Sequence, residues 1–322
     1  MPIIDSTYVP PLLLSNGHLQ TLFPTLFRRT AGFPYQRERI TTPDDDFLDL
    51  DWAVQPFRRI AIIAHGLEGD SNRTYVLGMV RALIKGGWDA VVWNARGCGG
   101  EPNQTLRFTH SGATEDLQTV LSHVAASHNY DEIALIGFSL GGNVTLKYLG
   151  ENGKQIHPKV TKAVTFSVPC DLQSGSLQLA GMANRIYMRR FLRDLRKKIR
   201  IKMRAMPGEI NDKGYAQLRT FEDFDNRYTA PIHGFADAND YWRKSSCRPF
   251  LKNISIPTLL VNARNDPFLA GPCFPIEESE ANPHLYLEMP ISGGHVGFVT
   301  FNPEGEYWSE TRAVSFLGAN PS

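Results

Sequence analysis

Short apolar runs alternate with segments of helical spacing along most of this 322-residue chain, and this alternation limits its fold more than any other feature. The apolar run Arg59–Gly66 precedes a helical pattern at Thr74–Trp88, and Asp89–Gly97 precedes another at Thr114–His128. Continuous apolar strands separated by helices of about 10–15 residues are typical of a mostly parallel sheet covered by helices on both faces. The same alternation predicts further strands and helices at Glu132–Phe138, Leu140–Gly150, Lys162–Cys170, Pro257–Asp266, His284–Pro290 and Tyr307–Phe316.

The stretch from about residue 171 to residue 250 breaks this alternation. It is charged and aromatic, and it contains no obvious strand. We therefore predict one α/β domain, formed by residues 1–170 and 251–322, into which residues 171–250 are inserted as a helical cap. The aromatic second half of this cap either shapes a pocket over the core or only packs against it, and the sequence favours neither reading. The residues concerned are Phe224, Tyr228, His233, Phe235, Tyr241 and Trp242.

The bulk composition argues against several classes of protein. A formal net charge of +1 gives no reason to expect nucleic acid as a partner, and no apolar stretch approaches the roughly 18 residues of a membrane-spanning helix. The first residues lack the basic start and apolar run of a secretory signal, so we expect a cytoplasmic protein, monomeric or dimeric. The run Asp44–Asp46 lacks the spaced partners of a metal site and is typical of a turn before a strand. No zinc site or disulfide framework is expected from the widely spaced cysteines Cys98, Cys170, Cys247 and Cys273.

One serine follows a predicted buried strand in the sequence Gly137-Phe138-Ser139-Leu140-Gly141. A serine at a sharp turn from strand to helix adopts a strained backbone, and the residues two positions away must be very small to avoid a clash. The turn also places Ser139 at a helix N-terminus, where free N–H groups favour negative charge. The spacing of glycines and serine occurs by chance in about one chain in ten of this composition, so its structural context has to support it.

A serine hydroxyl is a weak nucleophile without an adjacent base. His295 lies in a glycine-rich loop after the last predicted strand, and Asp266 lies just past the strand that begins at Pro257. Each residue alone has an ordinary alternative, since a single histidine is usually structural and an aspartate before proline is usually a turn residue. Together, Ser139, Asp266 and His295 follow the chain order of the α/β-hydrolase triad. We therefore predict nucleophile, acid and base in these three positions.

The same chemistry needs two N–H donors for the oxyanion of the tetrahedral intermediate. The N–H of Leu140, the residue after the nucleophile, is the first candidate. The second is the N–H of Leu67, which follows the turn His65-Gly66 at the end of a predicted strand. The alternative for this second position is an ordinary glycine turn.

Several longer segments resemble the α/β-hydrolase superfamily and, more narrowly, the YheT-like hydrolases, whose relatives include the embryogenesis-associated hydrolases and phospholipase-type α/β-hydrolase-domain proteins. The resemblance covers nearly the whole chain, and it implies the same triad and the same two oxyanion donors, with no metal or organic cofactor. The segments that carry it are NGHLQTLFPTLFRR (Asn16–Arg29), HGLEGDSNRTY (His65–Tyr75), NARGCGGEPN (Asn94–Asn103), HSGATEDL (His110–Leu117), GFSLGGN, FDNRYTAPIHGFADANDYWRKSS (Phe224–Ser246) and SGGHVGF.

These observations predict a serine hydrolase that cleaves carboxylic esters through an acyl-enzyme on Ser139. Two alternatives remain: a lipase or phospholipase that uses the same triad on lipid, and a binding module without catalysis.

The stretch Arg185–Arg204 in the cap carries ten basic residues and one acidic residue. Its apolar residues Phe191, Leu192, Leu195 and Ile199 fall on one helical face. A basic amphipathic helix of this kind is able to dock on anionic lipid beside the active site. The alternative is a solvated cap helix whose charges pair with acidic residues such as Glu222, Asp223 and Asp225.

Overall fold

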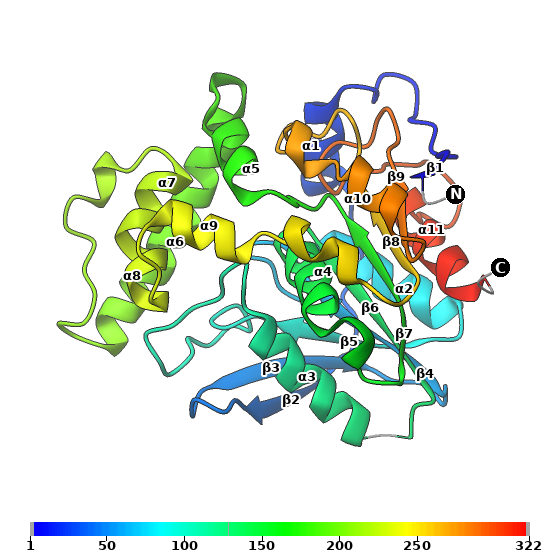
Figure 1. The fold of residues 1–322 in the computed structure, drawn as a ribbon, viewed down its shortest axis with the longest axis horizontal. Helices are drawn as coiled ribbons and strands as arrows, with labels where there is room; N and C mark the ends of the chain where they lie inside the picture. Colours follow the sequence, from blue (N-terminus) through cyan, green and yellow to red (C-terminus); the bar gives the residue numbers. More distant parts are fainter. Residues whose placement is uncertain (1–2, 128, 320–322) are drawn as a thin grey trace.

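The computed structural model describes residues 3–127 and 129–319, which contain a single nine-stranded sheet (Figure 1). Its strand order is β1-β9-β8-β7-β6-β4-β5-β3-β2, and the pairs from β1 to β5 in this order are parallel. The predicted mostly parallel sheet is therefore confirmed. The strands are β1 (Ile3–Ile4), β2 (Gln36–Thr41), β3 (Phe47–Ala53), β4 (Arg59–Ala64), β5 (Asp89–Asn94), β6 (Glu132–Phe138), β7 (Val160–Phe166), β8 (Thr258–Val261) and β9 (Leu285–Glu288).

An antiparallel hairpin, β2 and β3, closes one edge of the sheet. The predicted turn at Asp44–Asp46 connects these two strands, and both Asp44 and Asp46 accept hydrogen bonds from the buried guanidinium of Arg96. The apolar pattern did not predict β2, because this strand is charged and its side chains are mostly exposed at the sheet edge.

Helices cover both faces of the sheet, which explains why the strands are continuously apolar (Figure 1). In β4, Ile60 and Ile62 belong to one hydrophobic cluster and Ala61 and Ile63 to the cluster on the opposite face. The first cluster includes residues of α3 (Thr114–Ser127) and α4 (Leu140–Asn152), and the second includes residues of α2 (Thr74–Lys85) and α11 (Trp308–Gly318). His128, the last residue of the helix predicted at Thr114–His128, lies outside the described residues.

The chain between β7 and β8 folds into helices at one side of the sheet, and we call residues 171–250 the cap (Figure 1). Its aromatic and aliphatic residues share a separate hydrophobic cluster with Phe108 and Phe268 of the core. The cap helices are α5 (Leu172–Ala180), η2 (Met182–Asn184), α6 (Arg185–Ala205), η3 (Tyr215–Gln217), α7 (Phe221–Phe224), the π-helix η4 (Asp225–Thr229), α8 (Ala230–His233) and α9 (Ala238–Ser245), followed by η5 (Arg248–Asn253). The remaining helices are α1 (Gly17–Phe27), η1 (Gly153–Gln155), η6 (Gly271–Cys273) and α10 (Ile276–Ala281).

The basic helix α6 buries its apolar side, so that side faces protein rather than solvent. Leu192, Leu195 and Ile199 are all less than a tenth exposed. Several of its basic residues form ion pairs: Lys197 with Asp194, Arg196 and Arg200 with Asp212, and Lys198 with Glu68.

The acidic partners that the sequence suggested for this helix are wrong. Asp223 caps α7 by accepting hydrogen bonds from the N–H groups of Arg219 and Thr220, and Asp225 is buried beside Trp242. Among the described residues, no helix is both long enough and apolar enough to cross a membrane.

Candidate active site

Ser139 occupies a sharp turn between β6 and α4. Its φ of 52° and ψ of −117° lie in a region that side chains rarely adopt, as expected for a strained strand-to-helix turn. A Cβ on Gly137 would come within 2.5 Å of the Cα of Gly142, and one on Gly141 would overlap the carbonyl oxygen of Ala64. The flanking glycines are therefore required by the close approach of the backbone on both sides of the serine.

Three side chains at the carboxyl ends of different strands form one hydrogen-bonded chain. The Ser139 Oγ lies 2.9 Å from Nε2 of His295, and Nδ1 of His295 lies 2.8 Å from Oδ2 of Asp266. Because a carboxylate can only accept, Nδ1 carries the hydrogen and Nε2 is left to accept the serine proton. The structure thus brings the three predicted residues together in the order of a nucleophile, a base and an acid that orients the base.

Asp266 is fixed on its other side as well. Its side chain is fully buried, and Oδ1 accepts a hydrogen bond of 2.8 Å from the N–H of Phe268. The ring of Phe268 packs on the imidazole of His295 with 4.2 Å between ring centres. These contacts hold the carboxylate and the imidazole in one relative position.

The loop that carries His295 rests on α1, far away in the sequence. The N–H of His295 donates to Oγ1 of Thr21 at 2.9 Å, and the hydroxyl of Thr21 donates to the carbonyl of Gly17 at 2.7 Å. The next residue, Val296, has a φ of 56°, and its N–H donates to Oγ of Ser167 at 2.9 Å. Neither Thr21 nor Ser167 could be found from the sequence, since each acts through a contact between distant segments.

Leu67 and Leu140, the two residues predicted to supply oxyanion donors, both line a cavity that Ser139 also lines. Leu140 begins α4, so its N–H is one of the donors that a helix leaves without an internal partner. The peptide that leads to Leu67 is oriented by its carbonyl: Gly66 O accepts from Nδ1 of His65 at 2.8 Å and from the N–H of Gly69 at 3.0 Å. In a trans peptide the N–H points opposite to the C=O, so the N–H of Leu67 points away from His65.

His65 is held in the tautomer that this arrangement needs. Its Nε2 accepts a hydrogen bond from the N–H of Ala95 at 3.1 Å, so the hydrogen is on Nδ1. Burial lowers the pKa of His65 to about 4, which keeps the ring neutral. The sequence places His65 in the turn, but it does not show that this side chain orients the peptide between Gly66 and Leu67.

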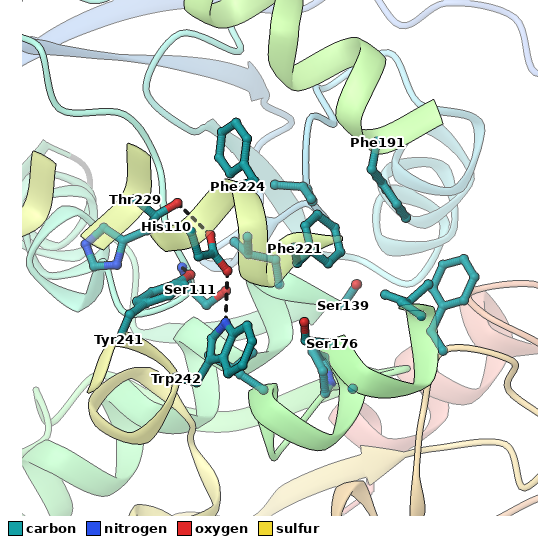
Figure 2. A pocket seen from close by; sticks show the side chains of 18 of the residues that line it. His110, Ser111, Ser139, Ser176, Phe191, Phe221, Phe224, Thr229, Tyr241 and Trp242 are labelled. Carbon is teal, nitrogen blue, oxygen red and sulfur yellow. Dashed lines mark hydrogen bonds between the residues drawn. The ribbon is translucent and has the colours of Figure 1, made fainter. Parts of the chain in front are cut away.

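Ser139 lies between two cavities. One lies between the cap and the core, has a volume of about 120 Å³ and is lined mainly by apolar side chains; we call it the enclosed cavity (Figure 2). The other has a volume of about 340 Å³ and is bordered by residues of α1, α6 and the loop that follows β4. Ser139, Leu67, Phe191, Phe268 and His295 line both cavities.

Some of the aromatic residues predicted in the cap shape a cavity, and others only pack within the protein, so both alternatives from the sequence apply. Phe224, Tyr241 and Trp242 line the enclosed cavity. Tyr228 and Phe235 instead pack against other aromatic side chains. Sequence analysis missed Phe221 as a lining residue of the cap, because helical periodicity does not show which face of a short helix meets a cavity.

The family model described as alpha/beta hydrolase fold matches residues 62–301, which include Ser139, Asp266 and His295. The chain belongs to the α/β-hydrolase family. This α/β-hydrolase is 37% identical to "Putative esterase YheT" of Escherichia coli (strain K12), over 97% of this chain and 93% of that protein. It is 29% identical to phospholipase ABHD3 of Homo sapiens, over 92% of this chain and 75% of that protein.

A further relative and a solved structure agree with this placement. The α/β-hydrolase is 30% identical to embryogenesis-associated protein EMB8 of Picea glauca, over 94% of this chain and 70% of that protein. The structure of the Pyrococcus furiosus esterase Pf2001 matches with a TM-score of 0.60 at 19% identity, over 90% of this chain and 96% of that one. The second likeness shows a shared fold.

Proposed function

We propose that this α/β-hydrolase cleaves carboxylic esters through an acyl-enzyme formed on Ser139. The observation that carries the proposal is the continuous chain of hydrogen bonds from Ser139 through His295 to Asp266. An imidazole that accepts from the serine while a buried carboxylate fixes its tautomer is the arrangement that activates a hydroxyl for acyl transfer. The relatives named as esterase and phospholipase support hydrolysis as the reaction class.

In the first half of the reaction, Oγ of Ser139 attacks the ester carbonyl and its proton passes to Nε2 of His295. The carbonyl oxygen becomes an oxyanion, for which the N–H groups of Leu67 and Leu140 are the proposed donors. The intermediate collapses, His295 gives its proton to the leaving alkoxide, and the alcohol departs. Asp266 stabilises the imidazolium throughout and remains ionised.

In the second half, a water molecule replaces the alcohol. His295 takes a proton from this water as its oxygen attacks the acyl carbon, and the same two N–H groups hold the second oxyanion. Collapse breaks the bond to Oγ, and His295 returns the proton to Ser139. The acid leaves, and no group outside the chain is consumed except water.

The two cavities suggest which part of the ester binds where. The apolar lining of the enclosed cavity suits the acyl group, and the larger cavity beside α1 and α6 suits the alcohol that leaves and the water that enters. The enclosed volume of about 120 Å³ is somewhat smaller than the roughly 150 Å³ of a cavity that holds one benzene molecule. We therefore propose short acyl groups as the preferred substrates.

Hydrolysis of p-nitrophenyl esters with acyl chains from about 2 to about 16 carbons tests this function. We expect turnover that is highest for the short chains and labelling of the wild type, but not of Ser139→Ala, by a fluorophosphonate. Turnover by the alanine variant at the wild-type rate would contradict the mechanism. A protein that neither turns over any ester nor reacts with the fluorophosphonate would instead be a binding module.

The alternative substrate class, membrane lipid, is favoured by one observation. Along α6, Arg185, Arg189 and Arg193 are exposed, and the apolar side chains of Met182 and Ile186 beside them are 91% and 75% exposed. Because the apolar side of α6 is buried, we propose that any contact with anionic lipid uses this exposed basic side and these two apolar residues.

Flotation with anionic vesicles tests the lipid contact. The double variant Arg189→Gln and Arg193→Gln removes two exposed cap charges, and Lys154→Gln with Lys252→Gln removes two exposed charges outside the cap. We expect vesicle binding to fall by about thirtyfold in the first variant, at about 1 kcal/mol for each of the two charges near the surface, and to be retained in the second. Equal binding of the two variants would contradict this contact, and a peak of turnover at long acyl chains would support lipid as the substrate.

A further inference from the structure

The far end of the enclosed cavity is polar, although its walls near Ser139 are apolar. Near the serine the lining includes Leu67, Leu140 and Phe268. On the other side of the view in Figure 2 lie His110, Thr229 and Tyr241, which line the same cavity. Apolar pockets usually contain a small number of placed polar groups that orient the ligand, so this polar end points to recognition of a particular group.

A buried carboxylate stands at this end without a cation. Asp225 is 8% exposed; its Oδ1 accepts from the hydroxyl of Thr229 at 2.6 Å and its Oδ2 accepts from Nε1 of Trp242 at 2.9 Å (Figure 2). No ion pair of Asp225 with a lysine, arginine or histidine occurs in the described part of the chain. Burial raises the pKa of Asp225 to about 6. Each carboxylate oxygen can accept more than one hydrogen bond, so acceptor capacity is left over.

The backbone is irregular at this same place. Asp225 and Thr229 are the first and last residues of the π-helix η4, and both line the cavity. Single π-helical turns are uncommon and often occur at functional sites, because the wider turn redirects side chains. The irregular turn is therefore a second observation, independent of the charge, that marks this end of the cavity.

His110, which also lines the cavity, has a ring N–H that no described residue binds. The Nδ1 of His110 accepts from the N–H of Gly112 at 3.1 Å, and burial lowers the pKa of His110 to about 3, so the ring is neutral and Nε2 carries the hydrogen. Within residues 3–127 and 129–319, this Nε2–H has no hydrogen-bond partner, and the neighbouring Oγ1 of Thr109 is buried without one. His110 and Thr109 both line the cavity.

We propose that Asp225 and His110 form a subsite for a hydroxyl group carried at the far end of the substrate's acyl chain. A hydroxyl donates to the carboxylate of Asp225 and accepts from Nε2–H of His110, so it satisfies both groups at once. An ammonium group would leave the His110 donor unpaired, a carboxylate would be repelled by Asp225, and a methyl end would bond to neither group. The hydroxyacyl ester is thus the substrate class that this cavity selects.

The proposal rests on the proposed ester hydrolysis and adds its specificity. Paired ethyl esters test it, for example ethyl 6-hydroxyhexanoate against ethyl hexanoate, with chain lengths from about 4 to about 8 carbons and the released acid titrated. The quantity compared is the ratio of kcat/KM for the hydroxylated ester to kcat/KM for its unsubstituted partner. Because both esters meet the same catalytic groups, general damage to the enzyme cancels in this ratio.

We expect the wild-type ratio to reach about tenfold or more at the chain length that spans the cavity. In Asp225→Asn the ratio should fall to about one: the amide oxygen still accepts from Trp242 and the amide NH2 donates to the hydroxyl of Thr229, but the side chain carries no charge and offers less acceptor capacity. His110→Phe, which keeps a flat ring without the N–H, should lower the ratio as well. Ser176→Ala removes a different hydroxyl that lines the cavity and should keep the wild-type ratio.

A wild-type ratio near one at every length, with the unsubstituted esters hydrolysed, would overturn the subsite and leave the ester hydrolase standing. A ratio that survives in both Asp225→Asn and His110→Phe would also overturn it. Absence of hydrolysis of every ester would overturn the ester-hydrolase proposal and the subsite with it.

Discussion

The two ends of the enclosed cavity differ in how their polar groups are bonded. At the serine end, Ser139, His295 and Asp266 bond one another, and the N–H of Phe268 binds the remaining carboxylate oxygen. At the cap end, the buried groups of Asp225 and His110 keep bonding capacity that no described residue uses. Side chains whose hydrogen bonds are all made within the protein are held in one geometry, as catalysis requires. Buried donors and acceptors that are not fully used are able to bind a ligand. Reaction and selectivity are thus assigned to different parts of the chain.

Removal of the nucleophile should give the largest effect and should touch only the serine end. Ser139→Ala is expected to lower kcat by about 10⁵-fold, because the attacking atom is lost while the oxyanion donors and the cavity remain. Steady-state hydrolysis of a short p-nitrophenyl ester measures this loss, and thermal unfolding checks that the fold is retained. A loss of tenfold or less would place the nucleophile elsewhere.

Asp266→Asn sharpens the comparison, because it disturbs one end while leaving the other intact. The amide favours the wrong tautomer of His295, so kcat is expected to fall by about 10⁴-fold. The ratio of hydroxylated to unsubstituted ester should stay at its wild-type value, since both esters lose the same base. A change in this ratio would show that the two ends are coupled and would break the division drawn above.

At the cap end, the expected signature is a dependence of stability on pH. Burial lowers the pKa of His233 to about 2, whereas an unfolded histidine titrates at about 6.5. Below about pH 6.5 this histidine therefore binds a proton in the unfolded state but not in the folded state. The free energy of unfolding keeps its full value above about pH 6.5 and decreases as the pH falls below it. Acidification from about pH 7 to about pH 5 should lower the free energy of unfolding by about 2 kcal/mol through this one group.

His233→Phe should remove that loss, because phenylalanine keeps the packing against Phe108 and cannot titrate. Neither ring nitrogen of His233 has a hydrogen-bond partner within the described residues, so the substitution breaks no bond. Urea unfolding at the two pH values measures the difference. If wild type and variant lose the same free energy on acidification, the histidine is already protonated in the folded cap and this prediction is wrong.

The smallest effect is expected at the support of the catalytic loop. Thr21→Val removes the acceptor for the N–H of His295 and should lower kcat by about tenfold with little change in KM, because the base is less well positioned. Thr119→Val is the matched control: its hydroxyl also bonds a carbonyl four residues earlier in a helix, at an exposed position of α3. Equal activity of the two variants would mean that α1 does not position His295.

The serine end could be predicted from the sequence because its signals are local. The glycines around Ser139 report a tight turn directly, and parallel strands deliver their carboxyl ends to one edge, so Asp266 and His295 follow from order alone. The cap end could not be predicted in this way. Asp225 was interpreted as a surface partner for α6, because nothing in the sequence shows that a π-helical turn directs it inward.

For a related reason, the sequence could not show what the apolar side of the basic helix α6 packs against. Its periodicity correctly grouped Leu192, Leu195 and Ile199 on one side, but periodicity does not say whether that side meets protein or lipid. Thr21 shows the same limit at long range, since a hydroxyl that supports a loop 274 positions later leaves no mark in its own neighbourhood.

The long sequence separation between Thr21 and His295 has a consequence for the order in which the site is assembled. Residues near the beginning of the described chain bond residues near its end, as Asn265 does with Ser15, Val299 with Gln20 and Tyr8 with Val299. Contacts of such high sequence separation close long loops and form late in folding. On a ribosome, β6 and the start of α4 are synthesised well before the loop that carries His295, so Ser139 exists for a time without the imidazole that it bonds.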